Sequence, residues 1–305
     1  MENYYVVKKG HRPGIYKTWL ECKEAVEGFK GPIYKKFSSF DEANTFFKSA
    51  KQDTFKDTFK DTNKIILGGN SPASIPVEEM QKIKEMSKHI KSSPYSDDLN
   101  YNVSGWNCIT GNSIENASND IYIFTDGSAR KSKSKGNTES YNSGVGVYLG
   151  YQCTNIKEQY NNKTNNQCEL IAMDYAFKLI VRYYRELSEI GKVIKIVSDS
   201  EYSIKACSIW LNQWKKNNWM TSSGEPVKNR ELIESIDASM SRIKLINSKI
   251  DAMGDTKADT SSRYKKIIVK LIHVNSHQTP DLQDKFKFNI WFGNYIADGL
   301  SQNTI

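Results

Sequence analysis

The pattern of apolar and polar residues changes along the chain. From residue 121 onwards, short apolar runs with the length of strands alternate with longer segments whose apolar residues recur every three or four positions. The short runs predict five strands, at residues 121–124, 144–149, 153–160, 193–197 and 267–272. The helical spacing predicts helices at residues 168–187, 201–217, 231–246 and 294–302. Strands that alternate with helices favour an α/β domain with a five-stranded mixed sheet flanked by helices.

Before this domain the texture is different. Residues 1–50 are aromatic and basic, and they are followed by a polar stretch that contains an imperfect repeat at residues 53–62. So few apolar residues cannot offset the entropy of ordering a chain, so we expect a flexible linker over residues 51–119. Inside it, the spacing of apolar residues allows one amphipathic helix at residues 76–90. The catalytic or binding domain would then cover residues 120–305.

Composition limits the possible classes of protein. The 305 residues are 38% hydrophobic and 26% charged, and no apolar run approaches the roughly 18 residues of a membrane span. The five cysteines are scattered without a CxxC pair, which argues against a disulfide framework or a zinc site. With no N-terminal targeting signal, we expect an intracellular protein of the nucleus or cytoplasm. The net charge of +8 permits a polyanionic partner, although it equally fits any soluble basic protein.

Two of the predicted strands run directly into an acidic residue, Asp126 after the first strand and Asp199 after the fourth. A carboxylate at the C-terminal end of a buried strand lies at the edge of an α/β sheet where ligands bind. Glu169 lies in the first turns of a helix, and Asp298 lies on the final helix. Singly, Asp199 could be a helix cap and Asp126 a turn residue. Together, four converging acids would repel one another unless cations intervene, and oxygen ligands suit Mg²⁺.

Eight segments occur in an order that is specific as a set, although each is weak alone. They are FTDGS at 124–128, GVGVY at 144–148, TNNQCEL at 164–170, VSDSEY at 197–202, WKKNNW at 214–219, PVKN at 226–229, HVNSH at 273–277 and GNYIAD at 293–298. Through them, residues 121–305 resemble the catalytic domain of type 1 ribonucleases H. The resemblance implies a ribonuclease H-like fold and an endonuclease that hydrolyses the RNA strand of RNA–DNA hybrids.

The resemblance also implies roles for single residues. Asp126, Glu169, Asp199 and Asp298 would hold two Mg²⁺ ions, for which Mn²⁺ can substitute. Such a pair of ions activates a water and stabilises the leaving 3′-oxygen, which gives 5′-phosphate and 3′-hydroxyl ends. His277 matches a mobile histidine that assists proton transfer or product departure, and its alternative is a plain loop histidine. The chain departs from the family by apparent insertions at residues 247–264 and 281–292, and the second widens the spacing between His277 and Asp298.

The resemblance further implies how two strands are told apart. The 2′-hydroxyls of RNA would be read by amides and backbone groups of Gly127, Ser128, Thr164, Asn165 and Asn166. The DNA strand would lie on a basic protrusion that interleaves aromatic and basic residues, namely Trp210, Trp214, Lys215, Lys216 and Trp219. The alternative is that the tryptophans are core residues. Thr164 and Asn229 match a pocket for a DNA phosphate, whose family arginine is replaced by Asn162, so that Lys163 could serve instead.

Residues 4–47 resemble the small hybrid-binding domain found at the N-terminus of eukaryotic ribonucleases H and in a plant-virus inclusion protein. The resemblance implies strands at 4–10 and 33–37, a helix entered through 15–22, and a closing helix at 40–47. Trp19 and Tyr34 would pack on DNA sugars, and Lys35 and Lys36 would contact phosphates. Some aromatic residues must instead fill a core this small.

Two functions remain open on the sequence. The first is a hybrid-cleaving enzyme, expected to act as a monomer on a hybrid duplex and away from membranes. The second is a non-catalytic protein that binds hybrids or double-stranded RNA through a relic nuclease fold. The presence of all four acids favours the enzyme. An integrase or transposase relative would share the acids, but the basic protrusion and the N-terminal domain favour a ribonuclease H.

Overall fold

The computed structural model describes residues 3–9, 11–12, 14–29, 31–43, 46, 63–65, 75–109, 120–133, 139–190, 193–253, 265–276 and 278–305. The chain divides into two compact units, Met1–Lys60 and Asp61–Ile305.

The N-terminal unit is a three-stranded antiparallel sheet in the order β2-β1-β3, with helix α1 packed on it. Its elements are β1 (Tyr4–Lys9), β2 (Gly14–Tyr16), α1 (Trp19–Val26) and β3 (Ile33–Phe37). Helix α1 begins after Thr18, whose hydroxyl accepts a hydrogen bond from the Glu21 N–H at 3.3 Å. The helix buries Cys22, Ala25 and Val26 against Val7 of β1. Of the predicted closing helix, residues 40–43 and 46 are described and helical.

The second unit is built on an eight-stranded mixed sheet in the order β4-β11-β10-β7-β8-β9-β5, with β6 also paired to β7. The strands are β4 (Asn63–Ile65), β5 (Ser92–Ser93), β6 (Asn107–Ile109), β7 (Asp120–Lys133), β8 (Glu139–Tyr148), β9 (Asn155–Asn161), β10 (Val193–Ser198) and β11 (Ile268–Val274). Strands β7, β10 and β11 are parallel, whereas β7, β8 and β9 are antiparallel. All five predicted strands are present in a mixed sheet, and β4, β5 and β6 are short additions that the sequence did not predict.

The helices of the second unit include every one predicted, with different bounds. They are α3 (Val77–Ser87), the short turn η2 (Val103–Gly105), α4 (Asn165–Arg182), α5 (Tyr184–Ile190), α6 (Glu201–Lys205), the π-helical segment η4 (Ala206–Trp210), α7 (Leu211–Lys216), α8 (Arg230–Met253) and α9 (Lys285–Ser301). The helix predicted at 201–217 therefore divides into three segments. Within it the Ser208 hydroxyl donates to the Ile204 carbonyl at 2.6 Å and competes with the α-helical hydrogen bonds.

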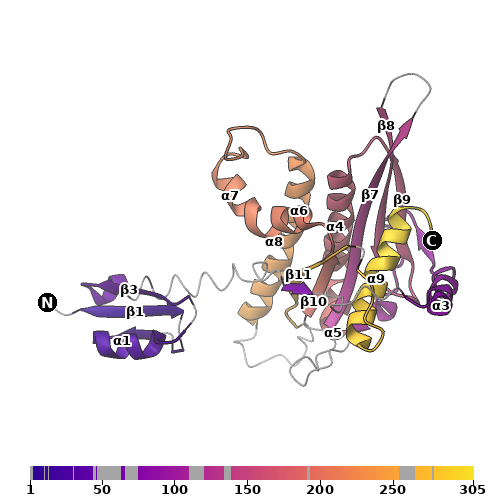
Figure 1. Cartoon of the computed structure of the whole chain (residues 1–305). Helices are drawn as coiled ribbons and strands as arrows, with labels where there is room; N and C mark the ends of the chain where they lie inside the picture. The colour runs from indigo at the N-terminus through magenta and orange to yellow at the C-terminus, as the bar shows by residue number, and fades with distance from the viewer. Residues whose placement is uncertain are drawn as a thin grey trace. The chain divides into compact units, whose positions relative to one another are not determined.

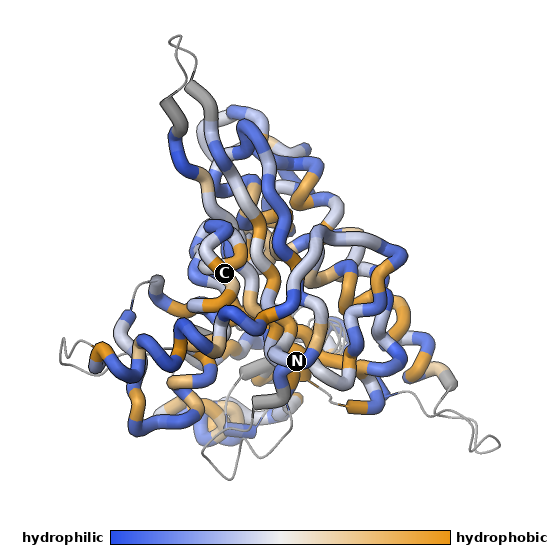
Figure 2. The backbone as a smooth tube through the Cα atoms, turned by 90° about the vertical axis from the view of Figure 1, so that its right-hand side faces the viewer, coloured by the Kyte–Doolittle hydropathy of each residue, from blue (hydrophilic) through white to orange (hydrophobic). Residues whose placement is uncertain are grey.

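Helices α4 and α9 cover opposite faces of the central strands (Figure 1). Helix α9 can lie directly on β8 because β8 carries glycines there. A Cβ atom on Gly144 would lie 1.9 Å from the Ser301 carbonyl oxygen, and one on Gly146 would lie 2.2 Å from that of Ala297. In Figure 2 the hydrophobic colour follows the central strands, where the core lies, and the projecting ends of β7 and β8 are mainly hydrophilic or neutral.

Residues 75–109, which composition assigned to a flexible linker, are instead packed within the second unit. Ile83 and Ile90 belong to the same buried cluster as Phe124. Tyr101 is fully buried, and the Trp106 indole N–H donates to its carbonyl oxygen at 3.1 Å. These anchors are widely spaced among polar residues, so their pattern resembles that of a linker. The rest of the predicted linker, apart from β4, lies outside the described residues.

The two apparent insertions lengthen helices. Helix α8 continues to Met253, into the first of them. Helix α9 begins at Lys285, so most of residues 281–292 form its first turns rather than a loop. The cysteines whose side chains are described, Cys22, Cys153, Cys168 and Cys207, are buried thiols without a disulfide. Within the described part of the chain, none of the helices has both the length and the apolar character needed to span a membrane.

Candidate active site

Asp126 lies in the interior of β7, not at the end of a strand as predicted. Strand β7 continues to Lys133 because it stays paired with β8, whereas its pairing with the parallel strand β10 ends at Thr125 and Ser198. Asp126 therefore comes directly after the point where one edge of β7 loses its partner. It is 6% exposed and pairs with Gly146, so it shares the face of the sheet that α9 covers. The alternative of a turn residue does not hold.

Asp199 follows the last residue of β10, as predicted. The alternative reading made it the N-cap of the next helix. That cap is Ser200, whose hydroxyl accepts a hydrogen bond from the Ser203 N–H at 3.2 Å. Asp199 is therefore not the helix cap, and it follows the C-terminal end of β10 as predicted.

Glu169 lies in the second turn of α4, directly above β7. A Cβ atom on Gly127 would lie 2.1 Å from the Glu169 backbone nitrogen, so only glycine allows this approach. The Glu169 carboxylate accepts hydrogen bonds from the Gly127 N–H and, at 3.4 Å, from the Asn165 amide. Its other oxygen, Oε2, is buried and has no hydrogen-bond partner among the described residues. A buried carboxylate oxygen without a donor needs another source of positive charge.

Carboxylate oxygens of Asp126, Glu169 and Asp199 lie within 4.8 Å of one another. Burial, and then the charge of Asp199, raise the pKa of Asp126 well above its usual range. Burial and the charges of Asp126 and Asp199 do the same to the pKa of Glu169. The ionisation of Asp126 and Glu169 is thus opposed by the carboxylates around them. The unpartnered Glu169 oxygen and this all-oxygen donor set fit a divalent metal ion.

Asp298 approaches the same place from α9. Together with Asp199 it lines a cavity of about 300 Å³, and its charge contributes to the raised pKa of Asp126. Its Oδ1 accepts a hydrogen bond from the Gln302 amide. Asp298 is not part of the three-acid group, so it stands at the margin of the cluster. The fifth predicted residue, His277, lies outside the described residues.

Comparison with known protein families shows which family this chain belongs to. The family model for the "Ribonuclease H1 N-terminal domain" matches residues 3–47, and the family model for "RNase H" matches residues 118–262. The ribonuclease H of Clostridium botulinum (strain Hall) is 36% identical over 132 residues, which are 42% of this chain and 82% of that protein. The chain belongs to the ribonuclease H family. It is therefore an enzyme of the hydrolase class, as the sequence predicted.

The family resemblance extends over both units. The ribonuclease H of Schizosaccharomyces pombe is 29% identical over 278 residues, which are 85% of this chain and 96% of that protein. The chain is thus of the eukaryotic ribonuclease H type, with the additional N-terminal domain. The solution structure of the PFV RNase H domain has a TM-score of 0.38 and 20% identity, and covers 60% of this chain and 92% of that one. Asp298 lies beyond the residues matched to "RNase H", so its assignment depends on the geometry above.

Some of the residues that the sequence predicted to contact the RNA strand lie next to the acids. The Asn165 side chain bridges α4 and β7, since its Oδ1 accepts a hydrogen bond from the Ala129 N–H at 3.1 Å. The Ser128 hydroxyl donates to the Ser301 carbonyl at 2.9 Å. Thr164 is the N-cap of α4, and its hydroxyl accepts a hydrogen bond from the Gln167 N–H at 3.3 Å. Asn166 is exposed. Asn165 and Ser128 are therefore held next to the acids, whereas the Thr164 hydroxyl already has a structural use.

The predicted protrusion forms a row of aromatic rings. The ring centroids of Trp210 and Trp214 are 5.5 Å apart, and Tyr202 lies 6.1 Å from Trp210. Both tryptophans are partly exposed, so they are not core residues. The Asn229 amide donates to the Tyr202 hydroxyl at 3.3 Å and adjoins this row.

The basic residues of the protrusion have different surroundings. The Lys215 ammonium lies 2.6 Å from the Asp237 carboxylate, whereas Lys216 is exposed. Trp219 follows α7 in a turn, with a φ of 61°, and the Arg230 guanidinium lies 5.0 Å from its ring centroid. Trp219 therefore lies outside the helix that carries Trp214, is partly exposed and lies next to a cation.

In the N-terminal unit the two predicted sugar-packing residues are neighbours. Trp19 is 47% exposed and Tyr34 is 44% exposed, and their ring centroids are 5.7 Å apart. Lys36 shares their face of the sheet, because it pairs with Tyr5 and its ammonium lies 5.8 Å from the Tyr5 ring centroid. These residues form one exposed aromatic and basic surface.

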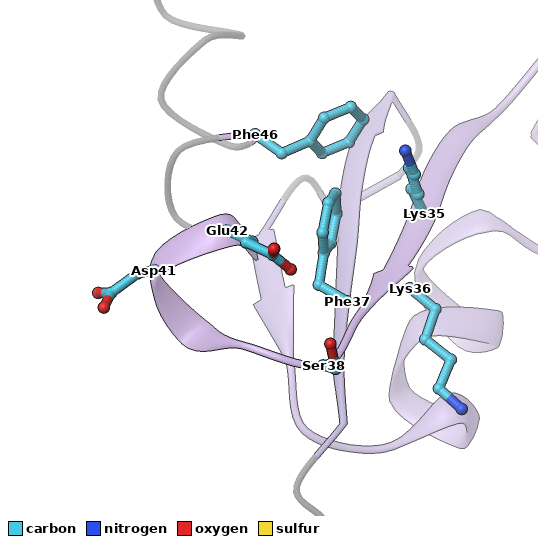
Figure 3. Close-up of a pocket in the computed structure, with 7 residues that line it drawn as sticks. All are labelled: Lys35, Lys36, Phe37, Ser38, Asp41, Glu42 and Phe46. Carbon is cyan, nitrogen blue, oxygen red and sulfur yellow. The ribbon is translucent and has the colours of Figure 1, made fainter.

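Lys35 points to the other face of β3, as the alternation of a strand requires. Its ammonium lies 5.4 Å from the Phe37 ring centroid and 5.8 Å from that of Phe46. These residues line a cavity of about 740 Å³, where Figure 3 shows the Lys35 and Lys36 side chains leaving β3 in different directions. The two lysines therefore do not form one phosphate site on a single face.

Three residues of the acidic site were missed in the sequence. Asn294 lines the cavity with Asp199 and Asp298, and its buried Oδ1 has no partner among the described residues. Ser301 and Gln302 donate hydrogen bonds to Asp126 and Asp298. All three lie three or four positions from Asp298, on the same face of α9. This spacing was the available signal.

Proposed function

We propose that this protein is an endoribonuclease that hydrolyses the RNA strand of RNA–DNA hybrids, acting as a monomer with Mg²⁺, or Mn²⁺ in its place. One observation carries the proposal. In a chain of the ribonuclease H family, three carboxylates converge within 4.8 Å and leave a buried Glu169 oxygen without a donor. Buried, uncompensated carboxylates destabilise a fold, so we infer that cations bind here and balance their charge.

The proposed mechanism assigns Asp126, Glu169, Asp199 and Asp298 as metal ligands. When bound, two divalent ions supply an activated water and charge stabilisation for the leaving 3′-oxygen, with 5′-phosphate and 3′-hydroxyl products. The chain's own part is to fix the carboxylates. The Gly127 N–H and the Asn165 amide orient Glu169, and the margin position of Asp298 leaves room for the scissile phosphate between α9 and β10. His277 is proposed to assist proton transfer or product departure.

Strand discrimination follows from groups on two sides of the acids. Gly127, Ser128, Asn165 and Asn166 are proposed to read 2′-hydroxyls, which only the RNA strand carries. On the other side, the Trp210 and Trp214 rings would pack on deoxyribose while Lys216 meets phosphates. Lys215, Thr164 and Asn229 are proposed to support this second contact, in addition to their hydrogen bonds and ion pair within the protein.

The domain division is also proposed in revised form. Residues 1–50 are a hybrid-binding domain, in which Trp19, Tyr34 and Lys36 contact the DNA strand from one face and Lys35 acts from the other. The catalytic domain extends upstream of residue 120 to include 75–109, which supplies Tyr101 and Trp106 to its core. The tether between the two domains is correspondingly shorter than residues 51–119.

The decisive experiment measures Mg²⁺-dependent cleavage of a labelled RNA–DNA hybrid by the full chain. Cleavage should occur in the RNA strand only, require the metal, and disappear in Asp126→Asn while hybrid binding persists. Removing one ligand disturbs the metal site but leaves the basic surfaces intact. Hybrid binding without any metal-dependent cleavage by the unaltered chain would favour the non-catalytic binding protein instead.

A further inference from the structure

The last turn of α9 brings two side chains onto the acids. Asp298, Ser301 and Gln302 are spaced i, i+3 and i+4, so they share one face of the helix. Ser301 is 1% exposed, and its hydroxyl oxygen lies 2.5 Å from Asp126 Oδ2 and 3.0 Å from the Asp298 carbonyl oxygen. A hydroxyl has one hydrogen to donate, and a carboxylate is the stronger acceptor. The Ser301 hydroxyl therefore donates to Asp126.

Gln302 performs the same task for the other acid. Its amide nitrogen donates to Asp298 Oδ1, and its amide oxygen accepts a hydrogen bond from the Arg130 guanidinium. A chain of hydrogen bonds thus runs from Arg130 on β7 through Gln302 to Asp298. Because a neutral amide stands between them, the Arg130 charge does not pair directly with Asp298. The negative charge that would attract a cation is therefore kept.

The backbone of this turn is fixed by contacts from the sheet. The Ser301 carbonyl oxygen accepts hydrogen bonds from the Ser128 hydroxyl at 2.9 Å and from the Gln159 amide at 3.3 Å. The same oxygen would lie 1.9 Å from a Cβ atom on Gly144, so only glycine permits the contact. These contacts hold the main chain from which the Ser301 and Gln302 side chains reach the acids.

We propose that Ser301 and Gln302 are positioning residues that each occupy one oxygen of a metal-ligating carboxylate and turn the other oxygen toward the ion. Asp126 Oδ2 and Asp298 Oδ1 are the occupied oxygens, so Asp126 Oδ1 and Asp298 Oδ2 would face the metal. The inference rests on the proposed function, because it assumes that these acids bind a divalent ion. Hydrogen-bond partners of metal ligands commonly contribute 10- to 100-fold to metal affinity.

The test measures Mn²⁺ binding to the full chain by isothermal titration calorimetry without nucleic acid. Ser301→Ala should raise the Mn²⁺ dissociation constant about tenfold or more. The matched control is Ser188→Ala on α5. Ser188 is also 1% exposed, and its hydroxyl donates to the Arg185 carbonyl at 2.7 Å, away from the acids. This control loses an equally buried hydroxyl and should keep the affinity of the unaltered chain, which separates positioning from a general loss of stability.

A second variant, Gln302→Leu, removes the donor to Asp298 at a partly exposed position and should also weaken Mn²⁺ binding. It carries the test if Ser301→Ala fails to fold, as circular dichroism would reveal. If the Ser301 and Gln302 variants bind Mn²⁺ as tightly as Ser188→Ala does, the positioning role is wrong although the metal site stands. If the unaltered chain binds no Mn²⁺, the metal site itself is wrong, and the proposed function fails together with this inference.

Discussion

Strand β7 carries two equally buried aspartates whose replacement by asparagine should have opposite effects on stability. Asp120 and Asp126 are each 6% exposed. The Asp120 carboxylate lies 2.6 Å from the Lys195 ammonium, whereas Asp126 lies within 4.8 Å of two other acids, Glu169 and Asp199. Asp126→Asn should therefore stabilise the metal-free protein, and Asp120→Asn should destabilise it.

The size of the effect follows from Coulomb's law. Two carboxylates 4.8 Å apart repel by about 3.5 kcal/mol at an effective dielectric constant of roughly 20. Asp126 has two such neighbours, and burial and the neighbouring charges raise the pKa of Asp126 and Glu169, so the full repulsion of three ionised carboxylates is an upper limit. We expect Asp126→Asn to gain about 1–4 kcal/mol at pH 8, and each kcal/mol is worth roughly 2–4 °C in melting temperature.

The pH dependence has a definite sign. An acid whose pKa is raised in the folded state holds its proton more tightly there than in the unfolded chain, so the fold loses stability as pH rises. The advantage of Asp126→Asn should be absent below the ordinary carboxyl value of 3.8 and should open as pH rises above it. Saturating Mg²⁺ should close or reverse the gap, because the ion stabilises only the chain with all its ligands.

The assay is urea or thermal denaturation followed by circular dichroism, in EDTA and in Mg²⁺, across pH 5 to 8.5. Asp120→Asn is the matched control and should lose about 1–3 kcal/mol, because it removes the charged partner of Lys195 while the Tyr122 hydroxyl still accepts from the ammonium at 2.9 Å. Its stabilisation by Mg²⁺ should persist. The reasoning is refuted if Asp126→Asn in EDTA is less stable than the unaltered chain at pH 8. A stability difference that does not change with pH would refute it equally.

Three further predictions concern the domains and the substrate. Trp106→Ala should lower the free energy of unfolding by about 3–5 kcal/mol, whereas Val77→Ala, at a position 81% exposed, should change it by no more than about 0.5 kcal/mol. Equal effects of the two variants would mean that residues 75–109 are a linker after all. Lys36→Ala should weaken binding of long hybrids and lower its salt dependence more than Lys35→Ala does, measured by fluorescence anisotropy, and the reverse order would reject the single-face surface. A lone ribonucleotide in duplex DNA should be cut far more slowly than a run of four, and efficient incision there would contradict the proposed 2′-hydroxyl readers.

The sequence predicted the acids better than the strands that carry them. Asp199 could be assigned because β10 is a mainly apolar strand, with Lys195 and Ser198 as its polar residues, and ends just before Asp199. The apolar run at residues 121–124 is shorter than β7, because the residues of β7 after Phe124 are mainly polar. Cross-strand pairing with β8 then carries it to Lys133, and no local pattern reports such pairing. The family motifs kept Asp126 in the site despite the wrong boundary.

Other features depend on contacts between segments distant in the sequence. Tyr101 and Trp106 look like isolated aromatic residues in polar surroundings, and their burial depends on distant parts of the chain such as Tyr183. The first turns of α9 were interpreted as an insertion because the segment between His277 and Asp298 is longer than in the family. By contrast, the opposite faces of Lys35 and Lys36 need no distant contact, because the two-residue period of a strand implies them. The prediction that both lysines contact phosphates did not take this period into account.

The mixed sheet explains why the active site lies where it does. On one edge, β7 loses its parallel partner after Thr125, and on the other it stays paired with β8 to Lys133. The residues directly after Thr125 thus have one unpaired edge, while the other edge of the strand stays paired with β8. Gly127 allows α4 to bring Glu169 to that opening, and the glycines of β8 allow α9 to bring Ser301 to it from the other face. The acids therefore meet at a change of pairing within the sheet, and β7 can continue past Asp126 without closing the site.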